Sequence, residues 1–307
     1  MRMRTWTRSM RRVFGRPAIA LLLVAVALGM VDCGSSSDDF NPTLFAVEFG
    51  NDAFVAVGQD STIANSADGS NFLLQVVAPL GSLLSLTYGN GIFLTSGKDG
   101  LVFTSTDTAF WFQQYLNTTR TLRGATYGNG TYVLVGDEGN CFISTNTGAW
   151  AGRFTGTSAE LEAAAFGNGT FVAVGKGGAI IASPDASNWT VAASPTTQDL
   201  YGVGYGAGTF VAVGNGGTIL LSQDGLDWRI VAPPTSKNLT AVTVAGGLVI
   251  VVGQSGTILS SSDFVNYSAH DSGTSKDLFG VTYGNGVYVA VGRHARIINS
   301  TDGVNWF

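Results

Sequence analysis

One phrase recurs seven times along this chain at an unbroken interval of 39 residues. It runs from a leucine through an aromatic residue, Gly-Asn-Gly and an apolar stretch to a glycine, and it ends with serine, aspartate, glycine and tryptophan. Three positions are identical in every unit: the leucines are Leu44, Leu83, Leu122, Leu161, Leu200, Leu239 and Leu278, the glycines are Gly58, Gly97, Gly136, Gly175, Gly214, Gly253 and Gly292, and the serines are Ser66, Ser105, Ser144, Ser183, Ser222, Ser261 and Ser300. A unit of this length cannot bury its own apolar surface, so the units must pack on one another.

Each unit contains three or four short apolar stretches separated by turn signals, which is typical of a β-meander. In the fifth unit the pattern predicts strands over residues 200–205, 209–213, 219–222 and 228–231. Four other units place Asn-Gly between the first two strands, and this pair accepts the positive φ of a tight hairpin. The sequence therefore predicts an all-β fold, a seven-bladed β-propeller of four-stranded repeats over residues 44–307, with a β-solenoid as the alternative.

Two positions on the first strand of each unit favour the propeller. The first is always small, as expected where innermost strands converge: Ala46, Ser85, Gly124, Ala163, Gly202, Ala241 and Gly280. The second is aromatic except at Val244, and it is predicted to pack between blades: Phe49, Tyr88, Tyr127, Phe166, Tyr205 and Tyr283. The last unit stops at Phe307, where a fourth strand is due. Either residues 35–40, which fall in the same register, complete that blade, or it has three strands and a stub.

The first 33 residues predict export. A basic stretch precedes an apolar run from Ala18 to Val31, which is too short to span a bilayer comfortably and is typical of a signal peptide. The run Arg11-Arg12-Val13-Phe14 resembles a twin-arginine motif, with an ordinary basic n-region as the alternative. Cys33 resembles the lipidated cysteine of bacterial lipoproteins, and residues 34–43 would be its polar tether. Plain secretion is the alternative, because Asp32 departs from the small-residue pattern. The expected location is the cell envelope, with attachment to a membrane through the lipid anchor only, and otherwise the periplasm or the medium.

Charge and cysteine content exclude some functions. Ten basic and twenty acidic side chains remain after residue 33, a net charge of about −10, so nucleic-acid binding is not expected. Cys141 occupies a position that is isoleucine or valine in the other units. We expect it to be a buried small hydrophobe, with a catalytic thiol as the alternative.

The end of each unit matches a known turn motif, the Asp-box, Ser-x-Asp-x-Gly-x-x-Trp. Serine and aspartate oxygens are expected to accept hydrogen bonds from turn amides, while the aromatic residue folds back onto the sheet. The predicted pairs are Ser66 and Asp68, Ser105 and Asp107, Ser183 and Asp185, Ser222 and Asp224, Ser261 and Asp263, and Ser300 and Asp302.

From Leu44 onward the chain thus resembles the Asp-box (BNR-like) propellers, which include sialidases, sortilin-type receptors, xyloglucan-cleaving glycosidases and the photosystem II stability/assembly factor. The last is closest in appearance, because its repeats share the phrase Gly-x-Gly-x-aromatic-x-x-Val-Gly. The resemblance implies that these turns are structural. It implies no metal either, since one acid per turn cannot form a calcium cage.

The sequence gives little support to an enzyme. A sialidase-like mechanism needs an arginine cluster, a tyrosine–glutamate pair and an acid. None of the six arginines after the leader has the Phe-Arg-Ile-Pro context of that family. Glu48 and Glu162 are the best available carboxylate pair, but they belong to blades three apart, and the two histidines, His270 and His294, lack suitably spaced partners. We expect no catalytic site and no cofactor, with a glycan-active hydrolase as the alternative.

Function is expected where the repeats differ. One such position follows the conserved leucine: Phe45, Leu84, Arg123, Glu162, Tyr201, Thr240 and Phe279. The loop between the second and third strands also varies: Asp60, Lys98, Asp99, Asp137, Glu138, Lys176, Asn215, Gln254, Arg293 and His294. Propeller geometry predicts that both sets surround the channel on the face opposite the Asp-boxes.

This face is the predicted ligand-binding site, and its ligand is an unknown protein or a glycan. Phe45, Tyr201 and Phe279 would supply apolar contact, Arg123 and Arg293 directional polar contact, and Glu162 and His294 complete the set. The alternative is that these residues vary only because the sequence of surface loops is weakly constrained, without any binding role. The preferred function is a non-catalytic exported interaction scaffold, and an assembly factor for a membrane protein complex is a further alternative that the family resemblance suggests.

Overall fold

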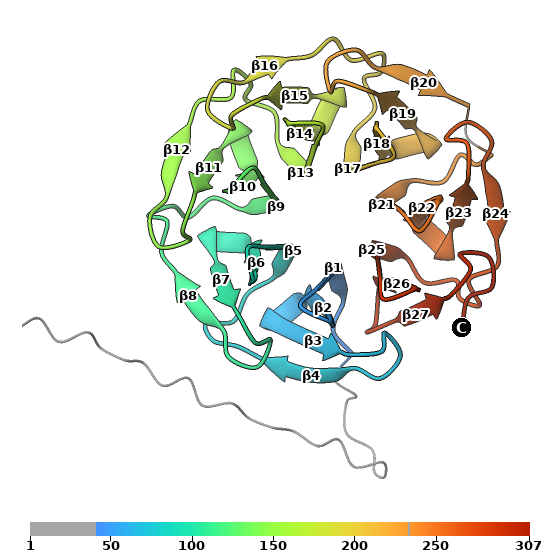
Figure 1. Cartoon of the computed structure of the whole chain (residues 1–307), viewed down its shortest axis with the longest axis horizontal. Coiled ribbons are helices and arrows are strands. Elements are labelled where there is room, and N and C mark those ends of the chain that lie inside the picture. Colours follow the sequence, from blue (N-terminus) through green and yellow to red (C-terminus); the bar gives the residue numbers. More distant parts are fainter. Residues whose placement is uncertain (1–40, 233) are drawn as a thin grey trace, which may run out of the picture.

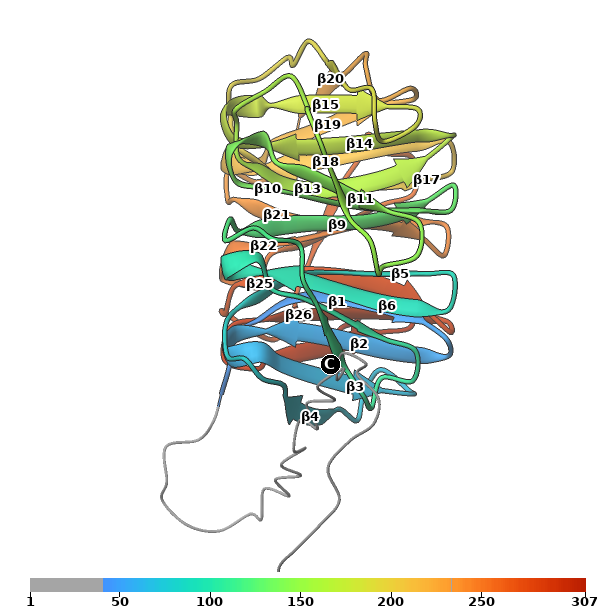
Figure 2. The same cartoon turned by 90° about the vertical axis from the view of Figure 1, so that its left-hand side faces the viewer.

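The computed structural model describes residues 41–307 except Pro233, so the leader, Cys33 and residues 35–40 lie outside the described residues. The chain forms a seven-bladed β-propeller rather than a solenoid (Figure 1). Each blade is an antiparallel meander, and the innermost strands surround a central channel. In the side view the strands run between two faces, with connecting loops at both (Figure 2).

The strand bounds repeat closely from blade to blade. The innermost strands are β1 (Leu44–Gly50), β5 (Leu83–Gly89), β9 (Leu122–Gly128), β13 (Leu161–Gly167), β17 (Leu200–Gly206), β21 (Leu239–Ala245) and β25 (Leu278–Gly284). The second strands are β2 (Ala53–Gly58), β6 (Ile92–Gly97), β10 (Thr131–Gly136), β14 (Thr170–Gly175), β18 (Thr209–Gly214), β22 (Leu248–Gly253) and β26 (Val287–Gly292). The third strands are β3 (Thr62–Ser66), β7 (Val102–Ser105), β11 (Cys141–Ser144), β15 (Ile180–Ser183), β19 (Ile219–Ser222), β23 (Ile258–Ser261) and β27 (Ile297–Ser300).

The outer strands are shorter: β4 (Leu73–Val76), β8 (Phe112–Gln114), β12 (Ala151–Arg153), β16 (Thr190–Val191), β20 (Arg229–Val231) and β24 (Ser268–His270). Single 3₁₀ turns connect second to third strands: η1 (Gln59–Ser61), η2 (Lys98–Gly100), η3 (Asp137–Gly139), η4 (Lys176–Gly178), η5 (Asn215–Gly217) and η6 (Gln254–Gly256). The strands predicted for the fifth unit agree with β17 to β20 to within one residue at each end.

Aromatic rings of one blade fill the space beside glycines of the preceding blade. Phe166 packs on Phe171 with ring centroids 4.5 Å apart. A Cβ added at Gly128 would lie 2.0 Å from Cγ of Phe166, so the end of β9 must be glycine. The small position also follows from close approach, because a Cβ at Gly280 would lie 3.1 Å from Cα of Ala46 in the neighbouring blade. Both predictions for the first strand are confirmed.

The seventh blade is a sheet of three strands, β25, β26 and β27, among the described residues. Phe307 begins a fourth strand and stops, since its N–H and C=O both pair with Asn299, at 3.0 and 3.1 Å. Ile297 is only partly buried as a result, whereas its equivalent Ile63 in the first blade is fully buried. Residues 35–40, the other candidate for the fourth strand, lie outside the described residues, so both alternatives for this blade stay predictions.

The turn after each third strand is held by its serine and aspartate. In the fifth blade, the hydroxyl of Ser222 donates to Asp224 Oδ1 (3.0 Å) and accepts from the N–H of Gly225 (2.8 Å). Asp224 Oδ1 also accepts from the amides of Leu226 and Asp227, and these hydrogen bonds hold the pKa of Asp224 below its ordinary value. Corresponding bonds occur at Asp68, Asp107, Asp185, Asp263 and Asp302, and at Asn146 in the third blade. We call these the serine–aspartate turns, and their acids serve the local backbone.

Cys141 lies in the core between blades three and four and is buried, which raises the pKa of its thiol to about 12. This agrees with the prediction of a small buried hydrophobe. In the part of the chain from residue 41 onward, no helix is long and apolar enough to cross a membrane.

Candidate binding site at the mouth of the channel

Each innermost strand has one residue that its neighbouring strand does not pair. In β1, Leu44 pairs with Gly58 and Ala46 pairs with Val57, so Phe45 has no partner residue in β2. The other six blades show the same shift. A bulge of this kind redirects a side chain out of the ladder. The seven redirected residues line a cavity of about 350 Å³ on the axis, which we call the mouth: Phe45, Leu84, Arg123, Glu162, Tyr201, Thr240 and Phe279.

Loop residues reach the same cavity. Gln254 and Arg293, from the loops between second and third strands, line the mouth together with Asn238 and Asp277. The two divergent sets thus meet on one face, while the serine–aspartate turns lie at the opposite ends of the third strands. His294 is different. It is exposed on the loop of the seventh blade and is not among the residues that line the mouth.

The residue before the conserved leucine fixes these loops. Its carbonyl accepts the N–H of the first loop residue in each blade, as Glu160 does for Lys176 at 2.9 Å. In three neighbouring blades its side chain also holds the loop of the preceding blade. Asp199 accepts from the N–H of Gly177 at 2.8 Å, and Asn238 and Asp277 act in the same way. This position was not predicted, although a usable signal was present: it is Asp or Asn in three successive units, at Asp199, Asn238 and Asp277.

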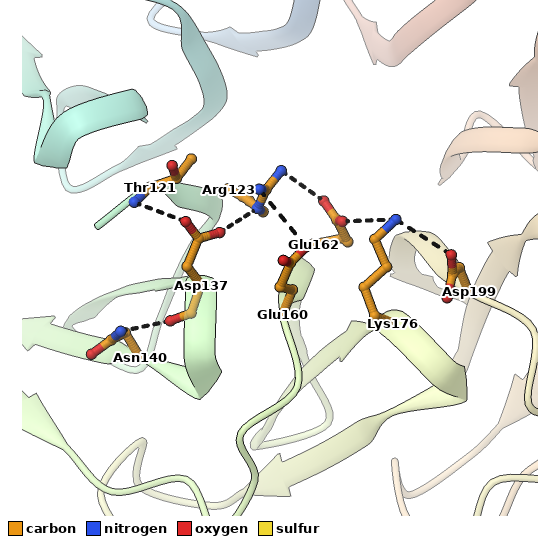
Figure 3. Close-up of polar contacts among 8 residues, drawn as sticks. All are labelled: Thr121, Arg123, Asp137, Asn140, Glu160, Glu162, Lys176 and Asp199. Atoms are coloured by element: carbon orange, nitrogen blue, oxygen red, sulfur yellow. Dashed lines mark hydrogen bonds and ion pairs between the residues drawn. The ribbon is translucent and has the colours of Figure 1, made fainter. Parts of the chain in front are cut away.

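A chain of ion pairs runs along one side of the mouth (Figure 3). Arg123 Nε donates to Asp137 Oδ1 at 2.7 Å. The same guanidinium lies 3.8 Å from a carboxylate oxygen of Glu160 and 3.7 Å from one of Glu162. Lys176 then connects the fourth and fifth blades, because its Nζ lies 3.4 Å from Glu162 and 3.3 Å from Asp199. This side of the mouth is therefore charged but largely paired.

The paired groups are not equally satisfied. The Glu162 side chain is only 14% exposed, and burial raises the pKa of its carboxyl against the opposing charges of Arg123 and Lys176. Burial also opposes ionisation of Asp137, but the hydrogen bond and charge of Arg123 outweigh it, so the pKa of Asp137 lies below its ordinary value. The pKa of Glu162 thus stays raised although two cations oppose the effect of its burial.

The opposite side of the mouth is apolar. The rings of Phe45 and Phe279 lie with centroids 5.8 Å apart and planes tilted by 51°. Leu84 continues this surface in the second blade. Because Glu162 belongs to the fourth of seven blades, it lies across the axis from the junction between blades seven and one, where the two rings meet (Figure 1). The mouth thus has an apolar cluster on one side and a network of ion pairs on the other, and the pair Arg293–Asp277 of the seventh blade also lines it.

The predicted roles of the two arginines, as polar contacts for a ligand, stay predictions. Arg123 lies within ion-pair distance of three carboxylates, and Arg293 Nη2 pairs with Asp277 Oδ2 at 3.0 Å. The Arg293 side chain is 51% exposed. The paired carboxylates of the hydrolase alternative are also separated. Glu48 lies three residues further along β1 than the mouth position, accepts a long 3.5 Å bond from Thr282, and does not line the cavity that Glu162 lines. Within residues 41–307, Pro233 apart, no three metal-ligating side chains form a cluster.

Larger hollows occur away from the axis. One of about 760 Å³ lies beside the serine–aspartate turns of the fifth and sixth blades and includes Asp224 and Asp263. Their carboxylates already accept hydrogen bonds from turn amides, which leaves them fewer free acceptor positions for a ligand. Another of about 850 Å³ lies at the outer edge around Leu80 and Tyr115. The mouth differs from both because all seven blades contribute to it through positions at which they differ.

Comparison with known proteins shows the fold. No family model matches this sequence, and no curated protein is similar to it in sequence. Among solved structures, YCF48 bound to a D1 peptide superposes with a TM-score of 0.70 at 16% identity, over 86% of this chain and 92% of that chain. YCF48 from Cyanidioschyzon merolae gives 0.66 at 15% identity, over 84% and 95%. The WD40 β-propeller domain of Doa1 gives 0.65 at 13% identity, over 86% and 96%. At such identities the similarity concerns architecture alone.

Proposed function

We propose that this protein is a non-catalytic binding scaffold that holds a segment of a partner protein at the mouth. The observation that carries the proposal is that one cavity collects, from all seven blades, a repeat position at which the residues differ in chemistry. Seven side chains of six residue types around one opening present an asymmetric surface, which recognition of an asymmetric ligand requires.

The site chemistry supports binding over hydrolysis. A glycosidase of the usual kind needs two carboxyl groups on either side of one bond. Glu48 and Glu162 do not line the same cavity, and Glu162 is occupied by Arg123 and Lys176. A glycan bound without hydrolysis is the alternative ligand.

The neighbour that carries a bound peptide supports a protein partner. Together with the resemblance to the photosystem II stability/assembly factor, it makes an assembly factor for a membrane protein complex the second candidate. The serine–aspartate turns support kinship with the Asp-box propellers. We further propose that the protein is exported and held at a membrane by a lipid on Cys33. Metabolic labelling with a fatty acid tests the anchor, and Cys33→Ser is expected to abolish the label while leaving the propeller intact.

A photo-crosslinker at the mouth tests the binding function. Benzoylphenylalanine at Tyr201 is expected to give protein adducts in the native envelope, because Tyr201 lines the mouth. The matched control is the same residue at Phe154, which is 86% exposed on the outer edge of the third blade. Equal adducts at both positions, or adducts at Phe154 alone, would contradict the proposal. Glycan-array binding that Tyr201→Ala abolishes, without protein adducts, would favour the glycan.

A further inference from the structure

The charges around the mouth are unbalanced in a way that constrains its ligand. The ion-pair chain with its outer member, the pair Arg120–Glu138, contains three cations and five carboxylates: Arg120, Arg123 and Lys176 against Asp137, Glu138, Glu160, Glu162 and Asp199. Arg293 and Asp277 add one of each. Over these ion pairs there are two more carboxylates than cations. A ligand group of opposite sign is attracted to this excess.

The excess is located on one side of the axis. Glu160 is 46% exposed, and its contact with Arg123 at 3.8 Å is the longest of the network. Glu162 is almost buried and lines the cavity itself. A ligand cation that lies beside these two carboxylates would share them with Arg123 and Lys176. It would offset the excess negative charge of the network.

The apolar side supplies a second contact of different chemistry. Phe45, Leu84 and Phe279 are each partly buried and face the same cavity. Tilted aromatic pairs readily accept a further aromatic or aliphatic side chain. Because the two phenylalanines lie across the axis from Glu162, a single chain segment that crosses the mouth reaches both sides.

We propose that the mouth selects a peptide segment that carries an aromatic or aliphatic side chain close to a lysine or arginine. The apolar side chain packs on Phe45 and Phe279, and the cation lies beside Glu160 and Glu162. An acidic segment is disfavoured, because it would meet the excess carboxylates of this ion-pair network. This inference rests on the proposed function and specifies the chemistry of its partner.

Three labelled heptapeptides of equal length test the inference on the purified protein. One carries Phe and Lys, the second Phe and Glu, and the third Ser and Lys, on the same Gly/Ser background. Fluorescence anisotropy is expected to show binding of the Phe/Lys peptide and at least roughly tenfold weaker binding of the other two. Added salt is expected to weaken the Phe/Lys peptide more than the Phe/Glu peptide.

Variants connect each preference to its side of the mouth. Glu162→Gln is expected to remove most of the preference for Lys over Glu, and Phe279→Ala that for Phe over Ser. Glu138→Gln is the matched control, because it makes the same charge change at a side chain that is 67% exposed and paired only with Arg120. A thermal melt of each variant confirms that it is folded. Retention of the Lys preference in a folded Glu162→Gln protein would overturn the inference.

The remaining outcomes separate the inference from the function on which it rests. Tighter binding of the Phe/Glu peptide would refute the proposed chemistry while leaving the mouth a binding site. Absence of binding by all three peptides up to about 1 mM would also refute the chemistry. Only the crosslinking result at Tyr201 decides whether the mouth binds a protein.

Discussion

Glu48 is expected to destabilise the propeller at neutral and alkaline pH. Its equivalents in the other blades are uncharged: Thr87, Thr126, Ala165, Gly204, Thr243 and Thr282. Burial raises the pKa of its carboxyl from about 4.5 to about 7, and hydrogen bonds from the Phe49 amide and the Thr282 hydroxyl only partly oppose this. We expect Glu48→Gln, which keeps the shape and removes the charge, to stabilise the protein.

The sign and size follow from linkage. Because the folded-state pKa of Glu48 lies above its unfolded value, the folded protein binds more protons between pH 4.5 and 7, and stability falls as pH rises through that window. A difference of about 2.5 in pKa corresponds to about 3.4 kcal/mol in full, and the partial exposure of the side chain reduces this to about 2 kcal/mol. Glu48→Gln should therefore gain about 2 kcal/mol at pH 8 and almost nothing at pH 4.

Urea denaturation followed by tryptophan fluorescence at both pH values measures this difference. Glu138→Gln is the control, and it should change stability little at either pH because its carboxylate is 67% exposed. A gain for Glu48→Gln that is equal at pH 4 and pH 8, or a loss at pH 8, would refute the burial argument. An altered m value would show instead that the unfolding reaction itself had changed.

Three further predictions concern stability. Ser222→Ala leaves a buried turn amide without its acceptor and should cost about 1–3 kcal/mol in urea denaturation; a change below about 0.5 kcal/mol would contradict the assigned role. Gly128→Ala places a Cβ 2.0 Å from Phe166 Cγ and should lower the free energy of unfolding by about 1–3 kcal/mol. The double variant Gly128→Ala/Phe166→Ala should lose less than the sum of the two single variants, and strict additivity would count against the contact. A chain that begins directly after Pro42 should melt a few degrees below one that retains it, because the Ala295 N–H loses its 2.6 Å acceptor; equal melting temperatures would show that the bond contributes nothing.

The architecture was predictable because it depends on patterns that every blade repeats. The conserved leucines are fully buried, the glycine–aromatic contacts recur between blades, and the turn serines bond as expected. Each of these needs only local residue chemistry and a neighbour of the same kind. The seven repeats of one sequence unit therefore determine most of the fold.

The placement of the divergent residues was predictable, but their pairing was not. The seven residues after the repeated leucine do line one cavity, as predicted, and ligand binding at this cavity stays a prediction. The contacts of Arg123 with three carboxylates were not predicted, since Asp137 comes from η3 of the third blade, and Glu160 and Glu162 come from the start of the fourth blade. Asp199 was overlooked because its role is to hold the loop of a neighbouring blade. His294 was included only for its place in a variable loop, and the left-handed backbone there (φ 58°) does not bring it to the cavity.

The apolar side of the mouth is built across the place where the two ends of the propeller chain meet. Phe45 comes from the first blade and Phe279 from the seventh, and the described residues join these blades through side-chain packing and single hydrogen bonds rather than through a shared sheet. A ligand side chain that packs on both phenylalanine rings would link the first blade of the propeller to the seventh. Its binding free energy would then resist opening at this junction, so occupancy would appear as a rise in melting temperature with ligand concentration.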